Sequence, residues 1–283
     1  MTSSTIRSTW PGFDKIRHLV IFGDSYSDVG YRGQPKFKPT ADEPLGVPFP
    51  GTTWNERGEP NWVGHLALKR RAAGNPLLVY DYAIGGQDLQ GFSHQVKMLY
   101  VKSLAPKPEW AQWTAQDTLF VSWIGINDCG KLFGHLESDA AMNAYQQKLF
   151  HSLQEVYDTG ARNFLFIDVP PIERAPGLQQ ANTVARAAMY NRWNTCLCSG
   201  VQSFTEDKSD ATVMLFSSHE LFRRVLDHPK DYDFDESKVN DEEGPVWFDF
   251  LHITSRMHAI VASAVEQFLS AQAAFPSGEV ADV

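Results

Sequence analysis

Short apolar runs alternate along the chain with segments whose apolar residues recur at helical spacing. The runs are rich in β-branched and aromatic residues and end at turn-forming residues. Runs of this kind, with few polar interruptions, are typical of parallel strands that are covered on both faces. The pattern predicts five strands, at residues 18–23, 77–80, 118–123, 164–167 and 211–216.

Amphipathic segments lie between and after these runs. The predicted helices cover residues 61–73, 139–158, 179–204 and 253–268. Strands that alternate with helices predict an α/β fold, a three-layer α/β/α architecture around a flavodoxin-like parallel five-stranded sheet. Residues 31–60, which are dense in proline and glycine, and the acidic residues 229–245 are expected to form loops.

The length and the net charge of the chain limit the kinds of protein that it can be. A chain of 283 residues fits one large domain or two small ones. We find no internal repeat and no interdomain linker, so we expect a single domain over residues 1–283. The net charge of −9 argues against a nucleic-acid partner and against an anionic membrane surface. No apolar run reaches the length of about 18 residues that a membrane-spanning helix needs, so no membrane span is expected.

The cysteines and the first residues bear on the compartment. Cys129, Cys196 and Cys198 allow at most one disulfide, so the fold must be stabilised by its core. Residues 1–15 are rich in serine and threonine and lack the apolar stretch of a secretory signal peptide. We therefore expect a cytoplasmic protein, and a secreted protein whose leader has been trimmed is the alternative.

One serine directly follows the first predicted strand. The sequence Phe22-Gly-Asp-Ser places Ser25 in a turn at the carboxyl end of that strand, where open parallel sheets hold their reactive groups. A helix that begins at this turn would favour developing negative charge. Serine is a poor nucleophile without an adjacent base, and the alternative is that Asp24 and Ser25 only cap a helix.

A candidate base lies near the other end of the chain. Asp249 and His252 are three residues apart, just before the last predicted helix, and this spacing lets the carboxylate meet the imidazole. Asp249 would then fix the tautomer of His252 and stabilise its charged form, as the third group of a triad does. The alternative is that Asp249 caps the final helix.

Two more loops carry candidate donors for an oxyanion. Gly86 follows the second predicted strand, and a glycine lets its backbone N–H face an oxygen closely. Asn127 follows the third predicted strand and offers a side-chain amide. In a flavodoxin-like order the first strand lies between the second and the third. Ser25, Gly86 and Asn127 are therefore expected to lie close together.

These blocks occur together in the order of a known family. They resemble the four blocks of the SGNH (GDSL-type) hydrolases and read Phe22-Gly-Asp-Ser-Tyr-Ser-Asp-Val-Gly30, Ala83-x-Gly-Gly86, Gly125-x-Asn127-Asp128 and Asp249-x-x-His252. The resemblance implies that Ser25 is the nucleophile, His252 the base and Asp249 its partner. It implies an oxyanion hole made of the Ser25 N–H, the Gly86 N–H and the Asn127 side chain. It implies neither a metal nor an organic cofactor.

A longer match resembles the fungal carbohydrate acetylesterase branch of that family. It runs through Gly58-x-Pro-Asn-Trp-Val63 and Tyr80-Asp-Tyr-Ala-Ile-Gly-Gly86. The resemblance implies a serine esterase that hydrolyses short acyl esters, foremost acetyl esters, of a small-molecule or oligosaccharide substrate through an acyl-enzyme on Ser25. The chain departs from many relatives at Gln87-Asp88, where they carry small residues beside the acyl pocket.

Other functions remain open at this point. An intracellular acyltransferase or a lipase-like acylhydrolase would use the same three residues, and a binding module could keep the fold without turnover. A phosphate-binding loop at Gly125-x-x-x-x-Gly-Lys131 is disfavoured, because Leu132 stands where a hydroxyl should ligate magnesium. Four tryptophans lie near the site blocks in sequence: Trp54, Trp62, Trp123 and Trp247. Stacking on a sugar would suit such aromatic side chains, although core packing is their more common role.

Overall fold

A six-stranded sheet forms the middle layer of the molecule. The computed structural model describes residues 2–34, 36–179 and 182–276. The strands follow the spatial order β1-β6-β5-β4-β2-β3. They are β1 (Ser3–Thr5), β2 (His18–Gly23), β3 (Leu78–Asp81), β4 (Thr118–Trp123), β5 (Asn163–Ile167) and β6 (Thr212–Phe216).

The five predicted strands are all present and parallel. β2 lies between β3 and β4, so the predicted flavodoxin-like order of these strands is confirmed. Every residue of β2 and of β4 is buried, as near-continuous apolar runs predict for strands covered on both faces. The loops after β2, β3 and β4 therefore leave the same edge of the sheet side by side.

The sixth strand corrects the prediction of a purely parallel, five-stranded sheet. β1 pairs antiparallel with β6, with Ser3 opposite Leu215 and Thr5 opposite Val213. The Ser-Ser-Thr sequence of β1 has no apolar alternation, because an edge strand can leave its polar side chains in water. Its pairing depends on the free edge of β6, and local sequence carries no signal of that edge.

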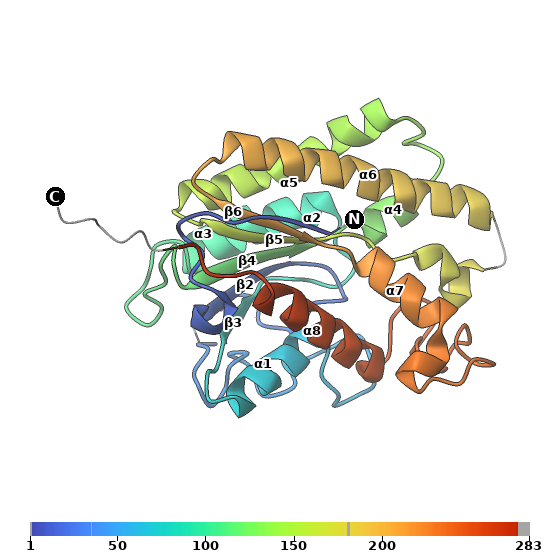
Figure 1. The fold of residues 1–283 in the computed structure, drawn as a ribbon, viewed down its shortest axis with the longest axis horizontal. Coiled ribbons are helices and arrows are strands. Elements are labelled where there is room, and N and C mark those ends of the chain that lie inside the picture. The colour runs from blue at the N-terminus through green and yellow to red at the C-terminus, as the bar shows by residue number, and fades with distance from the viewer. Residues whose placement is uncertain (1, 35, 180–181, 277–283) are drawn as a thin grey trace.

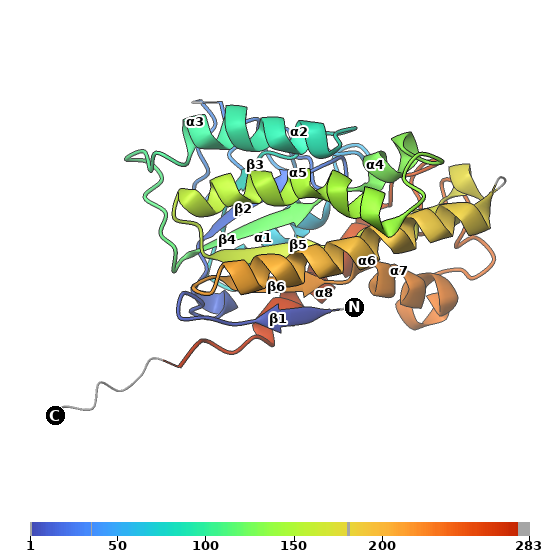
Figure 2. The same cartoon turned by 90° about the horizontal axis from the view of Figure 1, so that it is seen from above.

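Helices cover both faces of the sheet. Figure 1 shows α1 and α8 on one face and α2, α5 and α6 on the other, and Figure 2 looks onto the second face. Contacts join α1 to α8 and α5 to α6. The helices are α1 (Trp62–Ala72), α2 (Leu89–His94), α3 (Val101–Ser103), α4 (Ile126–Lys131), α5 (Asp139–Asp158), α6 (Thr183–Asp207), α7 (Ser218–Asp227) and α8 (Ser255–Ser270).

The four predicted helices correspond to α1, α5, α6 and α8. α5 has the predicted bounds, and the Ser138 side chain caps it by accepting from the Ala141 N–H. The predicted start of α6 was too early, because a 3-10 turn at Pro176–Leu178 precedes it, and residues 180–181 of that prediction lie outside the described residues. The short helices α2, α3 and α4 and the helix α7 were not predicted.

The buried side chains and the free cysteines show that packing of the core, and not a disulfide, stabilises the fold. Large aromatic side chains are fully buried on both sides of the sheet, among them Trp10, Trp62, Trp113, Trp123 and Trp193. Cys129, Cys196 and Cys198 are free thiols, so none of them forms a disulfide. Within the described ranges, no helix is long and apolar enough to cross a membrane.

Candidate active site

The turn after β2 presents Ser25 at the carboxyl edge of the sheet. The N–H groups of Ser27 and Asp28 both donate to the Asp24 carbonyl at 3.1 Å, and the Asp24 carboxylate accepts from the Tyr26 N–H. Gly30, at a φ of 82°, then takes the chain out of this single turn. No helix begins here in the part of the chain that the structure describes, so both the helix N-terminus at Ser25 and the helix-cap alternative were wrong.

A buried glutamine holds the end of β2 in place. The Gln95 side chain accepts from the Gly23 N–H at 2.9 Å and donates to the Gly23 carbonyl at 2.7 Å. Gln95 begins a π-helical segment, Gln95–Tyr100, that continues α2. π-helical turns are often found at functional sites. The N–H and the carbonyl of Gly23, two residues before Ser25, are thus both held by Gln95, which belongs to none of the sequence motifs.

A tight turn before α8 carries Asp249 and His252. The Phe248 N–H donates to the His252 carbonyl at 2.8 Å, and Trp247 pairs with Ile253 in an isolated bridge. One carboxylate oxygen of Asp249 accepts from the Leu251 and His252 N–H groups at 2.8 and 2.6 Å. α8 is capped instead by Thr254, so the alternative in which Asp249 caps the final helix was wrong.

The structure brings the three predicted residues together. The Ser25 Oγ lies 2.9 Å from the His252 Nε2, and the His252 Nδ1 lies 2.8 Å from the other carboxylate oxygen of Asp249. Only 5% of Ser25 and 8% of His252 is exposed. The arrangement can take a proton from Ser25 while Asp249 compensates the charge that forms on the ring.

Hydrogen bonds keep Asp249 ionised. Burial raises the pKa of Asp249, but the backbone and ring N–H groups of His252 and the Leu251 N–H outweigh burial and hold that pKa below its ordinary value. Asp249 therefore remains a carboxylate throughout the range in which a histidine ring exchanges its proton. An ionised partner at Nδ1 favours the tautomer that leaves the His252 Nε2 free to accept from Ser25.

The loops after β3 and β4 bring the candidate oxyanion donors to the same edge. Gly86 has a φ of 76°, which favours glycine. The Asn127 side chain, at the start of α4, donates to the Gln87 carbonyl at 2.8 Å. The amide carries two N–H groups, so this bond orients Asn127 and leaves the second N–H for an oxygen of a ligand.

The departure at Gln87-Asp88 has a structural role. Asp88 caps α2 by accepting from the Gln90 and Gly91 N–H groups, and it also pairs with Lys131 at 2.8 Å. The Lys131 ammonium donates to the Gly86 carbonyl as well, at 3.3 Å. These contacts tie the Gly86 loop to α4, which carries Asn127.

Replacing Asn127 with alanine is expected to lower kcat for p-nitrophenyl acetate by about 10²- to 10³-fold, because removing one donor from an oxyanion hole has an effect of that size. KM should change less, since the charge develops after binding. Asn143→Ala on α5 is the matched control and should retain wild-type kcat. A loss of less than about threefold for Asn127→Ala would exclude the oxyanion role.

The carboxyl group beside Ser25 makes stability depend on pH. The pKa of Asp24 is raised to about 7, mainly by burial, with smaller contributions from the charges of Asp128 and Asp28, and the Tyr26 N–H partly opposes the rise. Because the folded state holds this proton and the unfolded state releases it near pH 4, the contribution of Asp24 to stability is fully present below about pH 4 and is lost as pH rises towards about 7.

The variant Asp24→Asn resembles the protonated carboxyl group and should remove this dependence. At about 1.4 kcal/mol per pH unit, the free energy of unfolding of the wild type should lose on the order of 4 kcal/mol more than that of the variant between about pH 4 and 7. Urea unfolding at both pH values measures the difference. Asp42→Asn, at an exposed carboxylate, should behave like the wild type, and parallel curves for Asp24→Asn and the wild type would contradict the account.

The tryptophans near the site blocks divide into two groups. Trp62, Trp123 and Trp247 are buried and belong to the core, as the more common role predicts. Trp54 is 45% exposed, and its ring centroid lies 5.3 Å from that of His252. Trp54 is therefore the one of these four that can meet a ligand at Ser25.

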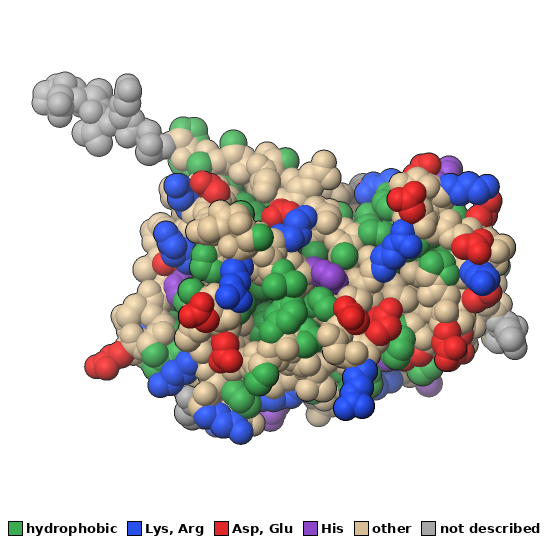
Figure 3. Space-filling model, turned by 90° about the horizontal axis from the view of Figure 1, so that it is seen from below, with side chains coloured by type: hydrophobic (Ala, Val, Ile, Leu, Met, Phe, Trp, Pro, Cys, Tyr) green, Lys and Arg blue, Asp and Glu red, His purple; other side chains and the backbone are tan. Residues whose placement is uncertain are grey.

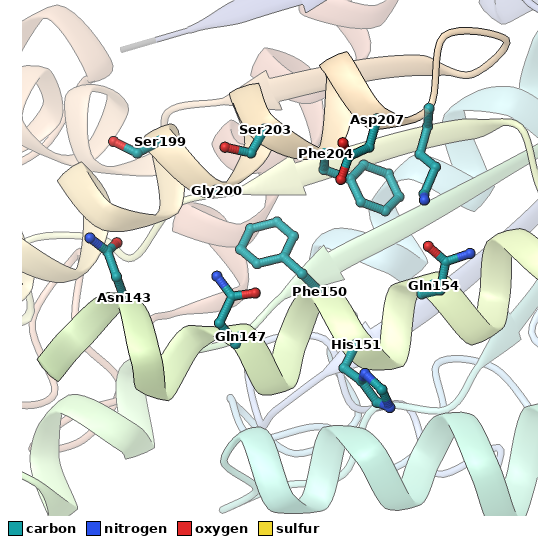
Figure 4. A pocket seen from close by; sticks show the side chains of 11 residues that line it. Asn143, Gln147, Phe150, His151, Gln154, Ser199, Gly200, Ser203, Phe204 and Asp207 are labelled. Atoms are coloured by element: carbon teal, nitrogen blue, oxygen red, sulfur yellow. The ribbon is translucent and has the colours of Figure 1, made fainter. Parts of the chain in front are cut away.

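One groove outside the Ser25 site does not bring a nucleophile and a base together. This groove, of about 540 Å³, lies between α5 and α6, where the Phe150 ring points towards Gly200 (Figure 4). His151 points away from Ser199 and Ser203 across that groove (Figure 4). In the described ranges no group of three or more histidine, cysteine or acidic residues is placed to hold a metal ion.

Comparisons with known proteins agree on one family. The sequence model of the GDSL-like lipase/acylhydrolase family matches residues 19–265. An acetylesterase of Thermothelomyces thermophilus is 32% identical over 268 residues, which cover 88% of this chain and 87% of that protein. A GDSL esterase/lipase of Arabidopsis thaliana is 27% identical over 77% of this chain and 71% of its own length.

Solved structures share the fold. A variant of Axe2, an acetyl xylan esterase from Geobacillus stearothermophilus, superposes with a TM-score of 0.57 at 16% identity, over 93% of this chain and all of that one. LAE5, an α/β hydrolase from the metagenome of Lake Arreo, gives a TM-score of 0.55 at 15% identity, over 94% of this chain and all of its own. Together with the family match, these findings show that the chain belongs to the GDSL-like lipase/acylhydrolase family and is a carboxylic ester hydrolase.

Proposed function

We propose that the protein hydrolyses acetyl esters of sugars or oligosaccharides through an acyl-enzyme on Ser25. The observation that carries this proposal is the continuous chain of hydrogen bonds from Ser25 through His252 to Asp249, with lengths of 2.9 and 2.8 Å. A serine, a base and an orienting carboxylate in this order are the minimal set for acyl transfer.

The reaction runs in two halves. In the first, the Ser25 Oγ attacks the ester carbonyl while the His252 Nε2 takes its proton, and the imidazolium then protonates the leaving alcohol. The Ser25 and Gly86 N–H groups and the second N–H of Asn127 would stabilise the negative oxygen of the tetrahedral intermediate. In the second half, His252 removes a proton from water, which attacks the acyl carbonyl. The bond to the Ser25 Oγ then breaks, and the imidazolium returns the proton to that oxygen as the acid leaves.

A relative of the chain supports a short acyl group. The relative that is 32% identical is named an acetylesterase. The Axe2 structure, an acetyl xylan esterase with the same fold, makes an acetylated sugar a reasonable first substrate to measure.

A panel of esters tests this function. Hydrolysis of p-nitrophenyl acetate, butyrate and octanoate should show kcat/KM falling with chain length, and acetylated xylo-oligosaccharides should release acetate. Fastest turnover of the octanoate ester would overturn the acetyl preference and favour the lipase-like alternative. Repeating the acetate reaction with an unacetylated xylo-oligosaccharide present distinguishes hydrolysis from transfer, since a transferase would yield acetylated sugar in place of free acetate.

A further inference from the structure

Two exposed aromatic side chains flank His252. Trp54 is 45% exposed and Phe250 is 54% exposed, although large hydrophobic side chains are usually covered. The ring centroids of Trp54 and Phe250 lie 5.3 and 6.4 Å from that of His252, at interplanar angles of 33° and 72°. They come from different loops, one before α1 and one before α8, so their convergence on His252 is a feature of the fold.

Trp54 is held rigidly in spite of its exposure. Its indole N–H donates to the Asp28 carboxylate at 3.3 Å, and the same carboxylate oxygen accepts from the Gly85 N–H at 2.9 Å. The Arg32 guanidinium donates to both carboxylate oxygens of Asp28, at 2.7 and 2.9 Å. The indole lies so close to Gly85 that a Cβ there would come within 2.2 Å of it. A ring fixed in this way loses little conformational entropy when a ligand covers it.

Phe250 is anchored through its backbone. The Gly177 N–H donates to the Phe250 carbonyl at 2.9 Å, and a Cβ at Gly177 would come within 3.0 Å of Phe250. The turn that Asp249 makes through the Leu251 and His252 N–H groups closes around this residue. The Phe250 side chain therefore projects from a braced turn into solvent.

The chemistry of ester cleavage says which part of a substrate meets these rings. The carbonyl oxygen must face Gly86 and Asn127, and the leaving oxygen must lie near the His252 Nε2 to receive its proton. The alcohol portion of the ester is thus on the His252 side, where the ring centroids of Trp54 and Phe250 lie 5.3 and 6.4 Å from that of the imidazole. Charged side chains border the same loops, because Arg32 donates to the Ala83 carbonyl and Lys131 to the Gly86 carbonyl.

We infer that Trp54 and Phe250 form an aromatic clamp for the alcohol portion of the ester, and that this portion is a pyranose ring. A pyranose presents C–H faces that stack on aromatic rings and hydroxyl groups that suit a polar, hydrated border. This inference rests on the proposed function and adds to it the residues that select the alcohol.

The surrounding surface offers a control. Figure 3 looks onto the side of the molecule that carries α1, where hydrophobic side chains gather near the centre beside a histidine and acidic side chains. Leu68 of α1 is 40% exposed, close to the value for Trp54, and it belongs to neither the clamp nor the Ser25 site. Removing its side chain changes the exposed apolar surface without touching the clamp.

Kinetics on two acetyl esters test the clamp. Trp54→Ala and Phe250→Ala are each expected to lower kcat/KM for acetylated xylobiose about tenfold, mainly through KM, and to lower it at least about fivefold more than for ethyl acetate, which has no ring. Trp54→Phe should keep part of the sugar preference, because it retains an aromatic face, although it loses the five-membered ring of the indole and the N–H that bonds to Asp28. Leu68→Ala should match the wild type on both esters.

Failure of the clamp, of the pyranose assignment and of the proposed function would each give a different kinetic result. Equal losses on both esters in Trp54→Ala and Phe250→Ala would overturn the clamp, while the proposed function would stand as long as the wild type hydrolyses both. A wild type that cleaves octyl acetate faster than acetylated xylobiose would overturn the pyranose assignment. A wild type that cleaves neither acetyl ester would overturn the proposed function itself.

Discussion

Replacing Ser25 with alanine should lower kcat for p-nitrophenyl acetate by about 10⁴- to 10⁶-fold, the size of effect seen when the nucleophile of a triad is removed. The variant lacks the oxygen that lies 2.9 Å from the His252 Nε2, so no acyl-enzyme can form. The oxyanion donors remain, and they account for the small residual rate that such variants retain.

The same variant should remain folded. Ser25→Ala removes a single hydrogen bond, so the free energy of unfolding should change by no more than about 1 kcal/mol. Thermal unfolding followed by circular dichroism provides this control. Turnover within tenfold of the wild type in a folded variant would show that Ser25 is not the nucleophile.

Replacing Asp249 with asparagine should lower kcat by about 10⁴-fold near neutral pH. The carbonyl oxygen of the new amide can keep the bonds from the Leu251 and His252 N–H groups, which turns the amide NH₂ towards the His252 Nδ1. That NH₂ donates, so the imidazole must accept at Nδ1 and carry its own hydrogen on Nε2. A ring with N–H at Nε2 cannot take the Ser25 proton.

An acidic residue outside the site gives the comparison for Asp249→Asn. Asp231→Asn, in the 3-10 turn Pro229–Tyr232, removes one exposed carboxylate that does not contact His252 and should leave kcat unchanged. Kinetics with p-nitrophenyl acetate at a single pH suffice for both variants. A loss of less than tenfold in Asp249→Asn would mean that another group orients His252.

Strands buried on both faces are well predicted from the sequence, and edge elements are not. β2 and β4 have their predicted bounds because every residue in them is buried, so the apolar run has the same length as the strand. β1 is polar and depends on the free edge of β6, which lies about two hundred residues away in sequence. α7 begins directly after β6, where its cap, Ser217, does not stand out from the apolar run before it.

The residues of the site also divide into those that the sequence predicts and those that it does not. Ser25, Asp249 and His252 stand in short motifs whose order along the chain carries information, so their proximity could be predicted. The contacts that place Gln95 and Trp54 could not, since they are long-range contacts with Gly23, Asp28 or Gly85 that leave no local pattern. The turn at Asp24 resembles the start of a helix in sequence, because capping residues are common to helices and to isolated turns.

Reaction with a fluorophosphonate, followed by peptide mapping, tests most directly whether a hydroxyl activated by His252 does the chemistry. We expect one covalent adduct per chain, on Ser25, and much slower labelling in His252→Ala. An adduct on another residue such as the buried Ser27, or equally fast labelling without His252, would contradict this mechanism.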